Sequence, residues 1–372
     1  MKILYDHQIF SQQVYGGISR YFFELMRQFS KNPEVSFQLS VKFSNNHYLE
    51  HSGFSNHKNF FKNFTLFGIP YFTRRRNEVM HFLNEKQSRR FLAKQDFDIF
   101  HPTYFRTYFL DLLGEKPFVL TIYDMIHELI INKFTTKDPT SLNKKILAQK
   151  AAKIIAISEN TKKDIVKILG IADEKIKVVH LANSVNPNSL CEFNLPSDKY
   201  LLFVGDRAGY KNFQLFISAI VPLLNEDKSL NVICVGSRPF SRRELKFLDD
   251  LNLKNQLFYF SVTDEQMAFL YKKAIAFVFP SKYEGFGIPV LEAFACSCPA
   301  ILSRASCLPE VGADAAEYFD PDNEDDIRQT ISKVITDKNK QQDLKRKGII
   351  RLQQFSWEKT AKQTLDIYRS IL

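Results

Sequence analysis

The sequence contains no run of about 18 apolar residues, which is the length that a membrane-spanning helix needs. The opening residues, from Met1 to His7, include an acid and an imidazole too early for the apolar core of a signal peptide. We therefore expect the protein to stay in the cytoplasm.

Cysteine is scarce, with five residues in the chain. The number is odd, Cys234 lies within an apolar run, and Cys296 and Cys298 stand one residue apart, which is not a usual zinc spacing. This pattern argues against a disulfide framework and predicts reduced thiols that are mostly buried.

Two common phosphate-binding fingerprints are absent. A dinucleotide fold needs Gly-x-Gly-x-x-Gly directly after its first strand, but ten residues separate Tyr5 from Gly16. The segment from Gly205 to Lys211 is not a Walker loop, because Asn212 stands where that loop has Ser or Thr. These absences argue against a nicotinamide enzyme and against a P-loop NTPase.

What the sequence does contain is an ordinary globular composition, with 45% hydrophobic and 25% charged residues. A length of 372 residues predicts two or three folded domains. Lys and Arg number 51 against 41 Asp and Glu, so the net charge is +10. This surplus favours an anionic partner, such as a nucleic acid, a nucleotide, a phosphosugar or an acidic membrane.

Short apolar runs alternate with segments of helical period through both halves of the chain. The runs predict strands at residues 2–5, 35–43, 98–101, 118–123, 153–158, 177–180, 200–205, 231–236, 257–260, 276–279 and 300–303. Repeated βα units form parallel, doubly wound sheets, so we predict an α/β protein of two Rossmann-like domains. These are residues 1–185 and 199–356, joined by a linker at 186–198. Ligands of such sheets bind beyond the carboxyl ends of the strands, which predicts a site in a central cleft that the two domains face.

The most informative segment runs from Pro280 to Ala293, directly after a predicted strand. A glycine-flanked loop turns there, and Pro289 suits the first position of a helix whose N–H groups can bind an anion. Glu284 and Glu292 bracket this loop, and ionised carboxylates accept hydrogen bonds from vicinal hydroxyls. The arrangement suits a sugar on one side and a ribose on the other. The alternative is an ordinary strand-turn-helix connection with two solvated glutamates.

The segment from Glu284 to Glu292 resembles the Glu-x7-Glu signature of the family 4 retaining glycosyltransferases, which have the GT-B fold. The resemblance extends from residue 1 to about residue 357. It implies that the last residues, 357–372, cross back onto the first domain.

Two other pairs of residues agree with this resemblance. Arg207 and Lys211, after the first strand of the second domain, resemble the paired cations with which the family holds the donor diphosphate. Gly16 and Gly17, before the first long helix, resemble the glycine loop of its N-terminal domain. The three features in this order are more specific than any one of them alone.

The resemblance implies transfer of a sugar from a nucleotide-diphosphate sugar to a hydroxyl of a glycan or lipid-linked acceptor, with retention of configuration. It places the reaction in bacterial surface polysaccharide or lipopolysaccharide assembly. Cations stabilise the leaving diphosphate without a metal or other cofactor, while Glu284 holds sugar hydroxyls and Glu292 the ribose. The remaining donor-binding positions that it implies are Val262, Gly285, Phe286 and Gly287.

The chain departs from the family pattern at the end of the strand predicted at 118–123. The family often has Thr-x-His-Asp there, with the histidine toward the transferred sugar, whereas this chain has Tyr123 in the histidine position. Asp124 keeps the family's position. His127 either takes over the sugar contact or is simply a loop histidine.

Two Asp-x-Asp matches correspond to the motif of manganese-dependent transferases of another fold. Asp96 and Asp98 precede a predicted strand, and Asp320 and Asp322 lie in a turn near the C-terminal helices. We therefore expect solvated turn acids and no metal site.

Three other classes of protein stay open as alternatives. A glycoside hydrolase could use two carboxylates but would not need the cation pair. A nucleotide-sugar epimerase shares the two-domain architecture and would act on the donor alone. A nucleic-acid binder would explain the charge, although the aromatic and basic motifs of RNA-binding sheets are absent.

The positive charge is concentrated in residues 58–94. Nine basic residues less two acids give this stretch a net charge of +7, and eight aromatic residues are interleaved with them. Such a segment suits the surface of an anionic membrane, or a lipid-linked acceptor, at the inner face of the membrane. The alternative is a helix that buries Phe82 and Phe91 beneath a solvated basic face.

Overall fold

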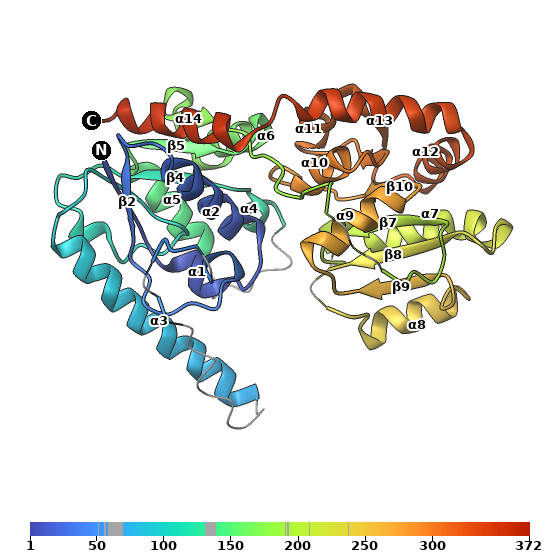
Figure 1. The fold of residues 1–372 in the computed structure, drawn as a ribbon, viewed down its shortest axis with the longest axis horizontal. Coiled ribbons are helices and arrows are strands. Elements are labelled where there is room, and N and C mark those ends of the chain that lie inside the picture. The colour runs from blue at the N-terminus through green and yellow to red at the C-terminus, as the bar shows by residue number, and fades with distance from the viewer. Residues whose placement is uncertain are drawn as a thin grey trace. The chain divides into compact units, whose positions relative to one another are not determined.

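The structure is a computed structural model of the chain. It describes residues 1–50, 52–55, 57–58, 70–130, 139–189, 191, 193–207, 209–236 and 238–372, with the backbone alone for 70–76. These residues form two compact units (Figure 1). Unit 1 contains residues 1–181 and 357–372, and unit 2 contains residues 182–356.

Unit 1 contains two three-stranded parallel sheets, of order β2-β1-β3 and β4-β5-β6. The strands are β1 (Lys2–Tyr5), β2 (Ser36–Leu39), β3 (Ile99–His101), β4 (Val119–Ile122), β5 (Lys153–Ala156) and β6 (Ile176–Val178). A parallel bridge between Phe100 and Phe118 joins the two sheets. Strands β3 and β4 are buried throughout, as parallel strands are when helices cover both faces of their sheet.

Helices connect these strands. They are α1 (Gln8–Gln12), α2 (Gly17–Phe29), α3 (Pro70–Ala93), α4 (Ile126–Leu129), α5 (Thr140–Lys150) and α6 (Glu159–Asp164). Ser158 caps α6, because its side chain accepts a hydrogen bond from the Thr161 N–H at 3.0 Å. A π turn at Ile165–Leu169 continues α6 and ends at Gly170, which adopts the left-handed conformation.

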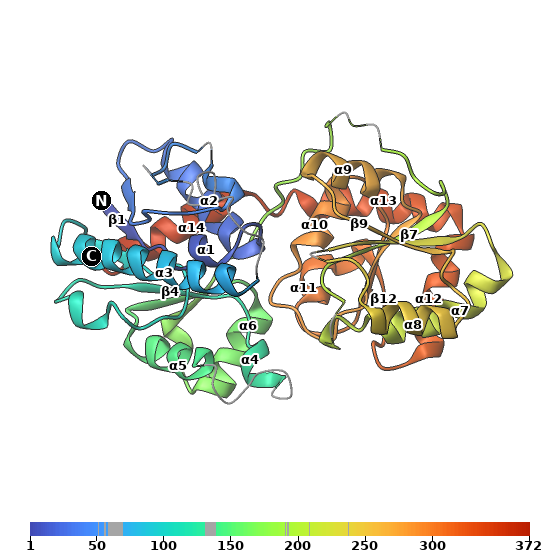
Figure 2. The ribbon, with the colours of Figure 1, turned by 90° about the horizontal axis from the view of Figure 1, so that it is seen from below.

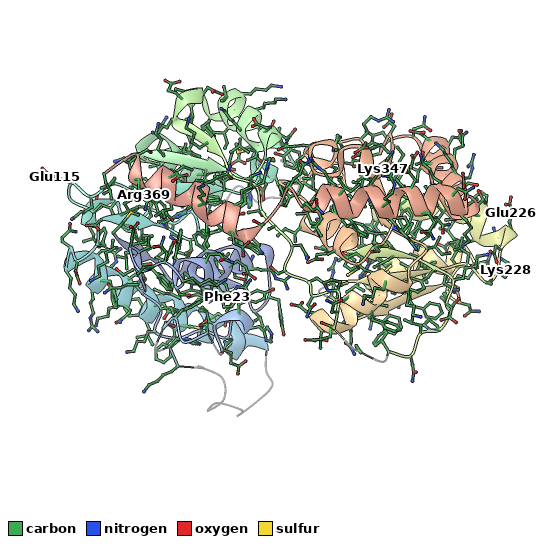
Figure 3. The ribbon with its side chains drawn as sticks, turned by 45° about the horizontal axis from the view of Figure 1, so that its top comes forward. Phe23, Glu115, Glu226, Lys228, Lys347 and Arg369 are labelled. Atoms are coloured by element: carbon green, nitrogen blue, oxygen red, sulfur yellow. The ribbon has the colours of Figure 1, made fainter. Side chains whose placement is uncertain are left out.

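The last helix of the chain, α14 (Trp357–Arg369), also belongs to unit 1, and it packs against α2. Its Tyr368 hydroxyl lies 3.2 Å from the Tyr5 hydroxyl of β1 and 2.6 Å from Nδ1 of His101 in β3. Nε2 of His101 contacts the Thr121 hydroxyl of β4 at 2.9 Å. Burial lowers the pKa of His101 to about 3, so its ring is neutral. These buried hydrogen bonds fix the last helix of the chain to the strands of unit 1. Arg369, near the end of this helix, is labelled in Figure 3.

Unit 2 contains one six-stranded parallel sheet of order β12-β11-β10-β7-β8-β9. Its strands are β7 (Tyr200–Val204), β8 (Asn231–Val235), β9 (Leu257–Phe260), β10 (Ala276–Phe279), β11 (Ala300–Ser303) and β12 (Ala316–Phe319). The chain adds β8 and β9 on one side of β7, then returns and adds β10, β11 and β12 on the other. The order therefore reverses between β7 and β10, which is the point where doubly wound sheets bind ligands.

The helices of unit 2 lie on both faces of this sheet (Figure 2). They are α7 (Phe213–Glu226), α8 (Arg242–Asp250), α9 (Asp264–Lys273), α10 (Ile288–Ala295), α11 (Leu308–Gly312), α12 (Glu324–Thr336) and α13 (Lys338–Leu352). Apolar side chains of β7, β8, α7 and α12, such as Phe203, Val232, Phe216 and Ile331, form one fully buried core.

The predicted strands and the parallel, doubly wound sheets are confirmed, although β2 is shorter than the apolar run at 35–43. Strand β12 was not expected, because only its two end residues are buried and it lacks the apolar run of a central strand. The residues expected to form a linker, 186–198, are part of unit 2.

Two other expectations concern cysteines and membranes. The five cysteines form no disulfide and four of them are buried, which confirms the expected thiols. Within the described ranges, no helix has both the length and the apolar character needed to span a bilayer. Of the basic stretch 58–94, residues 59–69 lie outside the described residues, and α3 contains residues 70–93.

A buried ion pair fixes the short helix α4 to α5. The Lys144 ammonium donates hydrogen bonds to Oε2 of Glu128 and to the Asp124 carbonyl, each at 2.9 Å. The exposed fractions of the two side chains are 0% for Lys144 and 7% for Glu128. The Lys144 nitrogen also lies 5.2 Å from the centre of the Phe105 ring. A charge taken out of water to this extent requires its partner.

We predict that Lys144→Met destabilises the protein by about 3–5 kcal/mol, because Glu128 is then buried without its cation. Urea denaturation followed by circular dichroism measures the change. Lys145→Met is the matched control, since Lys145 is exposed on the same helix and should change the stability by less than about 0.5 kcal/mol. Equal losses in the two variants would contradict a stabilising role for the pair.

Candidate active site

The connections that follow β7 and β10 meet where the strand order of unit 2 reverses. Nζ of Lys211, after β7, donates a hydrogen bond to Oε1 of Glu284, after β10, at 2.6 Å. The backbones also join, because the Lys282 N–H donates to the Tyr210 carbonyl at 2.8 Å. The structure therefore brings together two of the residues that the sequence predicts for a donor site.

The Lys211–Glu284 pair is largely withdrawn from solvent, with side-chain exposed fractions of 14% and 11%. Burial alone would lower the pKa of Lys211, but the charge and hydrogen bond of Glu284 outweigh it and raise this pKa above 10.5. Lys211 therefore loses its proton only at more alkaline pH than a lysine in water. At neutral pH it is a fixed cation at the reversal point.

The loop that carries Glu284 is held by the turn after β11. The Glu284 N–H donates to Oγ of Ser306 at 2.9 Å, and the Cys307 thiol lies 3.1 Å from the carbonyl oxygens of Glu284 and Phe286. The Ser303 hydroxyl donates to the Ser281 carbonyl. Sequence reasoning missed these supporting residues. Their signal is a run of small polar residues directly after an apolar strand next to β10.

Gly287 ends this loop and begins α10. Its φ of 96° lies in the region that favours glycine, and a Cβ built on it would lie 3.0 Å from Cδ2 of Leu308. Pro289 stands in the first turn of α10, as expected, and the Phe286 ring is buried edge-on against Phe355. The path of the loop from Gly285 to Gly287 is therefore fixed by local backbone geometry and packing.

Glu292 lies on α10 and is buried. The Tyr271 hydroxyl of α9 donates a hydrogen bond to its Oε2 at 3.1 Å. Burial, and then the charge of Glu292, hold the pKa of Tyr271 well above its ordinary value, so the phenol stays a donor. Tyr271 is a second residue that sequence reasoning missed, and it orients the carboxylate.

Val262 follows β9 and is half-buried. The next residue, Thr263, caps α9 in a capping box with Gln266, which confirms the N-cap interpretation of this segment. The contact of Val262 with a nucleotide base stays a prediction.

Arg207 has a different environment from the one expected beside Lys211. Its Nε donates to Oε1 of Glu244 at 2.7 Å, and its Nη2 donates to the carbonyls of Arg238 and Pro239 at 2.9 and 2.8 Å. Only 1% of the side chain is exposed. Arg207 therefore holds the segment after β8, apart from the Lys211–Glu284 pair, and the diphosphate contacts of Arg207 and Lys211 stay predictions.

The predicted residues of unit 1 lie at two helix starts. Gly16 precedes α2, which begins at Gly17, and the Ser19 N–H donates to Oε1 of Gln13 at 3.1 Å. A Cβ on Gly16 would lie 2.2 Å from this same oxygen. Glycine at position 16 therefore lets the Gln13 side chain reach the first turn of α2 and bind its N–H group.

Asp124 and His127 lie beside and on α4. Oδ1 of Asp124 accepts a hydrogen bond from the Ile126 N–H at 3.0 Å, and His127 is half-buried. Tyr123, which stands where the family often has histidine, is buried and donates to the Thr103 carbonyl at 3.3 Å. Its hydroxyl is therefore part of the interior of unit 1.

Both Asp-x-Asp pairs contact lysine. Asp96 pairs with the Lys2 side chain, Oδ2 of Asp98 accepts the Lys2 N–H at 2.7 Å, and Asp322 pairs with Lys282. Across the part of the chain that the structure describes, no cluster of three or more His, Cys, Asp or Glu side chains is arranged to hold a metal ion.

We predict that Gly287→Ala slows turnover at least about tenfold and destabilises the protein by about 1–3 kcal/mol, because φ is strained and Leu308 is crowded. Gly170→Ala is the matched control. Its φ of 66° is similarly unfavourable, but a Cβ there meets nothing within 4 Å. Initial rates and thermal unfolding of both variants measure the difference, and an equal loss of turnover in Gly170→Ala would contradict the prediction.

The chain is similar in sequence to known proteins. The chain matches the family models described as Glycosyltransferase Family 4, over residues 15–184, and Glycosyl transferases group 1, over residues 192–351. It is 29% identical over 228 residues to O-antigen chain mannosyltransferase B of Escherichia coli, a match that covers 58% of this chain and 60% of that protein.

The O-antigen chain mannosyltransferase RfbU of Salmonella typhimurium is also 29% identical, over 216 residues and 60% of its length. Sucrose-phosphate synthase from Thermosynechococcus elongatus has the same fold, with a TM-score of 0.76 at 19% identity over 100% of this chain and 98% of that one. The two family models together span both units. The chain belongs to the family 4 glycosyltransferases and has the GT-B fold.

Proposed function

We propose that the protein transfers mannose from a nucleotide-diphosphate mannose to a hydroxyl of a glycan or lipid-linked acceptor, in assembly of O-antigen or a related surface polysaccharide. The observation that carries the transferase chemistry is the Lys211–Glu284 pair where the strand order reverses. The sugar and the process are supported by the two O-antigen mannosyltransferases, which match over three fifths of their length.

Charge explains the roles that we propose. Breaking the bond between the anomeric carbon and the diphosphate builds negative charge on the leaving group, which the Lys211 cation stabilises without a metal. Once the diphosphate takes Lys211, the Glu284 carboxylate is released to accept hydrogen bonds from sugar hydroxyls. Glu292, oriented by Tyr271, accepts the ribose hydroxyls. The expected roles of Asp124 and His127 toward the transferred sugar stay predictions.

The configuration is retained in this proposal because the acceptor attacks from the face that the diphosphate leaves. The bond from the anomeric carbon to the phosphate oxygen breaks, and the new glycosidic bond forms. The acceptor proton passes to the leaving phosphate oxygen, so no side chain of the protein has to act as the base.

We expect Glu292→Gln to weaken donor binding about tenfold to a hundredfold, because it removes a charge-assisted hydrogen bond. Lys211→Ala should lower kcat more than it weakens binding, since its charge acts on the developing leaving group. Thermal shifts with GDP-mannose and UDP-glucose, and initial rates with the preferred donor, measure both effects. Glu265→Gln, an exposed site on α9, is the control and should leave both unchanged.

The products and the metal requirement decide between the alternatives. The proposal requires turnover in EDTA and a product with the anomeric configuration of the donor. Strict dependence on a divalent cation would contradict the absence of a metal from the mechanism, and an inverted product would contradict retention. An epimerised nucleotide sugar formed without an acceptor would identify an epimerase instead.

We also propose that α3 docks on the inner face of an anionic membrane. Val79 and Phe82 are 49% and 68% exposed, so the alternative that buries Phe82 in the core is wrong. Lys86 and Arg90 are exposed at the next turns of the same helix face. Exposed apolar side chains beside cations suit a surface of anionic lipid headgroups, which attract each nearby cation by about 1 kcal/mol.

We predict that replacing Val79 and Phe82 together by Ser reduces sedimentation with vesicles of anionic phospholipid several-fold, because apolar contact with the bilayer is lost. Leu142→Ser is the control, since Leu142 is 62% exposed on α5. Added salt should release the wild-type protein, because screening weakens its charge attraction. A wild-type protein that ignores these vesicles at low salt would overturn the membrane proposal and favour a soluble acceptor.

A further inference from the structure

Unit 2 contains a second basic site, between the starts of α7 and α8. A cavity of about 660 Å³ opens there, and its lining includes Arg207, Arg238, Arg243, Gln214 and Ser218. Among the described residues that line it, Lys211, Glu284 and Glu292 are absent. The cavity is therefore distinct from the Lys211–Glu284 pair, although Arg207 and Lys211 belong to the same connection after β7.

Arg207 forms the rigid base of this cavity. Its guanidinium carbon lies 4.7 Å from the centre of the Phe240 ring and 5.5 Å from that of Tyr259, and Nε and Nη2 are hydrogen-bonded. Within the described part of the chain, Nη1 makes no hydrogen bond. An arginine that is almost fully buried thus keeps one nitrogen without a hydrogen bond, and the same residue lines the cavity.

The other cations give the cavity a surplus of positive charge. Arg207 neutralises Glu244. Burial alone would raise the pKa of Glu244, but the hydrogen bonds from Arg207 and Ser241 outweigh it and hold this pKa below its ordinary value. Nη2 of Arg238 lies 3.7 Å from Oδ1 of Asp206. Arg243 is exposed and makes no ion pair with a described residue. Two of the three arginines therefore have a carboxylate partner, and the charge of Arg243 is the surplus.

The start of α7 adds donors to this charge. Its N-cap residue, Asn212, makes no side-chain cap, because its amide donates to the Pro321 carbonyl at 2.6 Å. The first-turn residues Phe213, Gln214 and Leu215 line the cavity. Backbone N–H groups at the start of a 14-residue helix and arginine side chains are both well suited to phosphate oxygens.

We propose that this cavity binds a phosphate-bearing small molecule, with Arg238, Arg243 and the start of α7 on the phosphate and Arg207 as its fixed base. The hydroxyl of Ser218 and the amide of Gln214 offer partners for the hydroxyls of a sugar phosphate, for which the volume leaves room. This site goes beyond the proposed transfer reaction and does not depend on it.

The test is calorimetric titration of the full chain with inorganic phosphate and with glucose 6-phosphate, at constant ionic strength. Arg243→Ser and Arg238→Ser should each weaken binding about tenfold or more. Arg242→Ser is the matched control, because Arg242 is an exposed neighbour on the same helix and does not line the cavity. It should bind both compounds as the wild type does.

The titrations also separate this cavity from the donor site. Lys211→Ala should keep phosphate binding, and tighter binding of glucose 6-phosphate than of phosphate would support a sugar phosphate as the ligand. Equal binding of the two would support the site with the free anion as its occupant. Loss of binding in Lys211→Ala, equal weakening by Arg242→Ser and Arg243→Ser, or no binding by the wild type would each overturn the proposal.

Discussion

The hydrogen bond between Lys211 and Glu284 depends on one topological constraint, the reversal of strand order between β7 and β10. Neighbouring parallel strands end at the same edge of a sheet, so the residues that follow them lie close together although 73 positions separate them. Because the two backbones also bond through Lys282 and Tyr210, the position of each charge is set by the other loop. A charged pair on two unconnected loops would lose more side-chain entropy on forming the same contact.

The polar supports of this pair come from the next strand of the sheet, because the turn after β11 contributes Ser306 and Cys307. Tyr271 of α9 supports the other carboxylate, Glu292. Burial raises the pKa of Cys307 well above its ordinary value, so this thiol stays protonated and keeps its hydrogen for the loop carbonyls. The electrostatics of the site are thus preorganised before a substrate binds, which is the condition for stabilising charge that develops during a reaction.

Apolar periodicity was enough to predict the doubly wound sheets and the positions of most strands, since buried parallel strands are short apolar runs. Spacing also placed Glu284 and Glu292 around the loop that begins α10, and the family resemblance pointed to Lys211, which contacts Glu284. The roles of these three residues toward a donor stay predictions. The environment of Arg207 could not be predicted, because its partner Glu244 is 37 residues away on a helix that the apolar pattern did not reveal. The contacts of Ser306 and Cys307 depend on loop geometry, for which a sequence has no periodic signal.

The connection from Gly205 to Lys211 separates two chemical environments. Arg207 is directed into the core beside α8, and Lys211 is directed to Glu284. Close backbone packing keeps this arrangement, because a Cβ on Gly236 would lie 2.4 Å from the Gly205 carbonyl oxygen. A side chain at position 236 would therefore push away the residue that follows β7. Glycine at this position lets the ends of β7 and β8 approach closely, on the side of the connection where Arg207 holds the segment after β8.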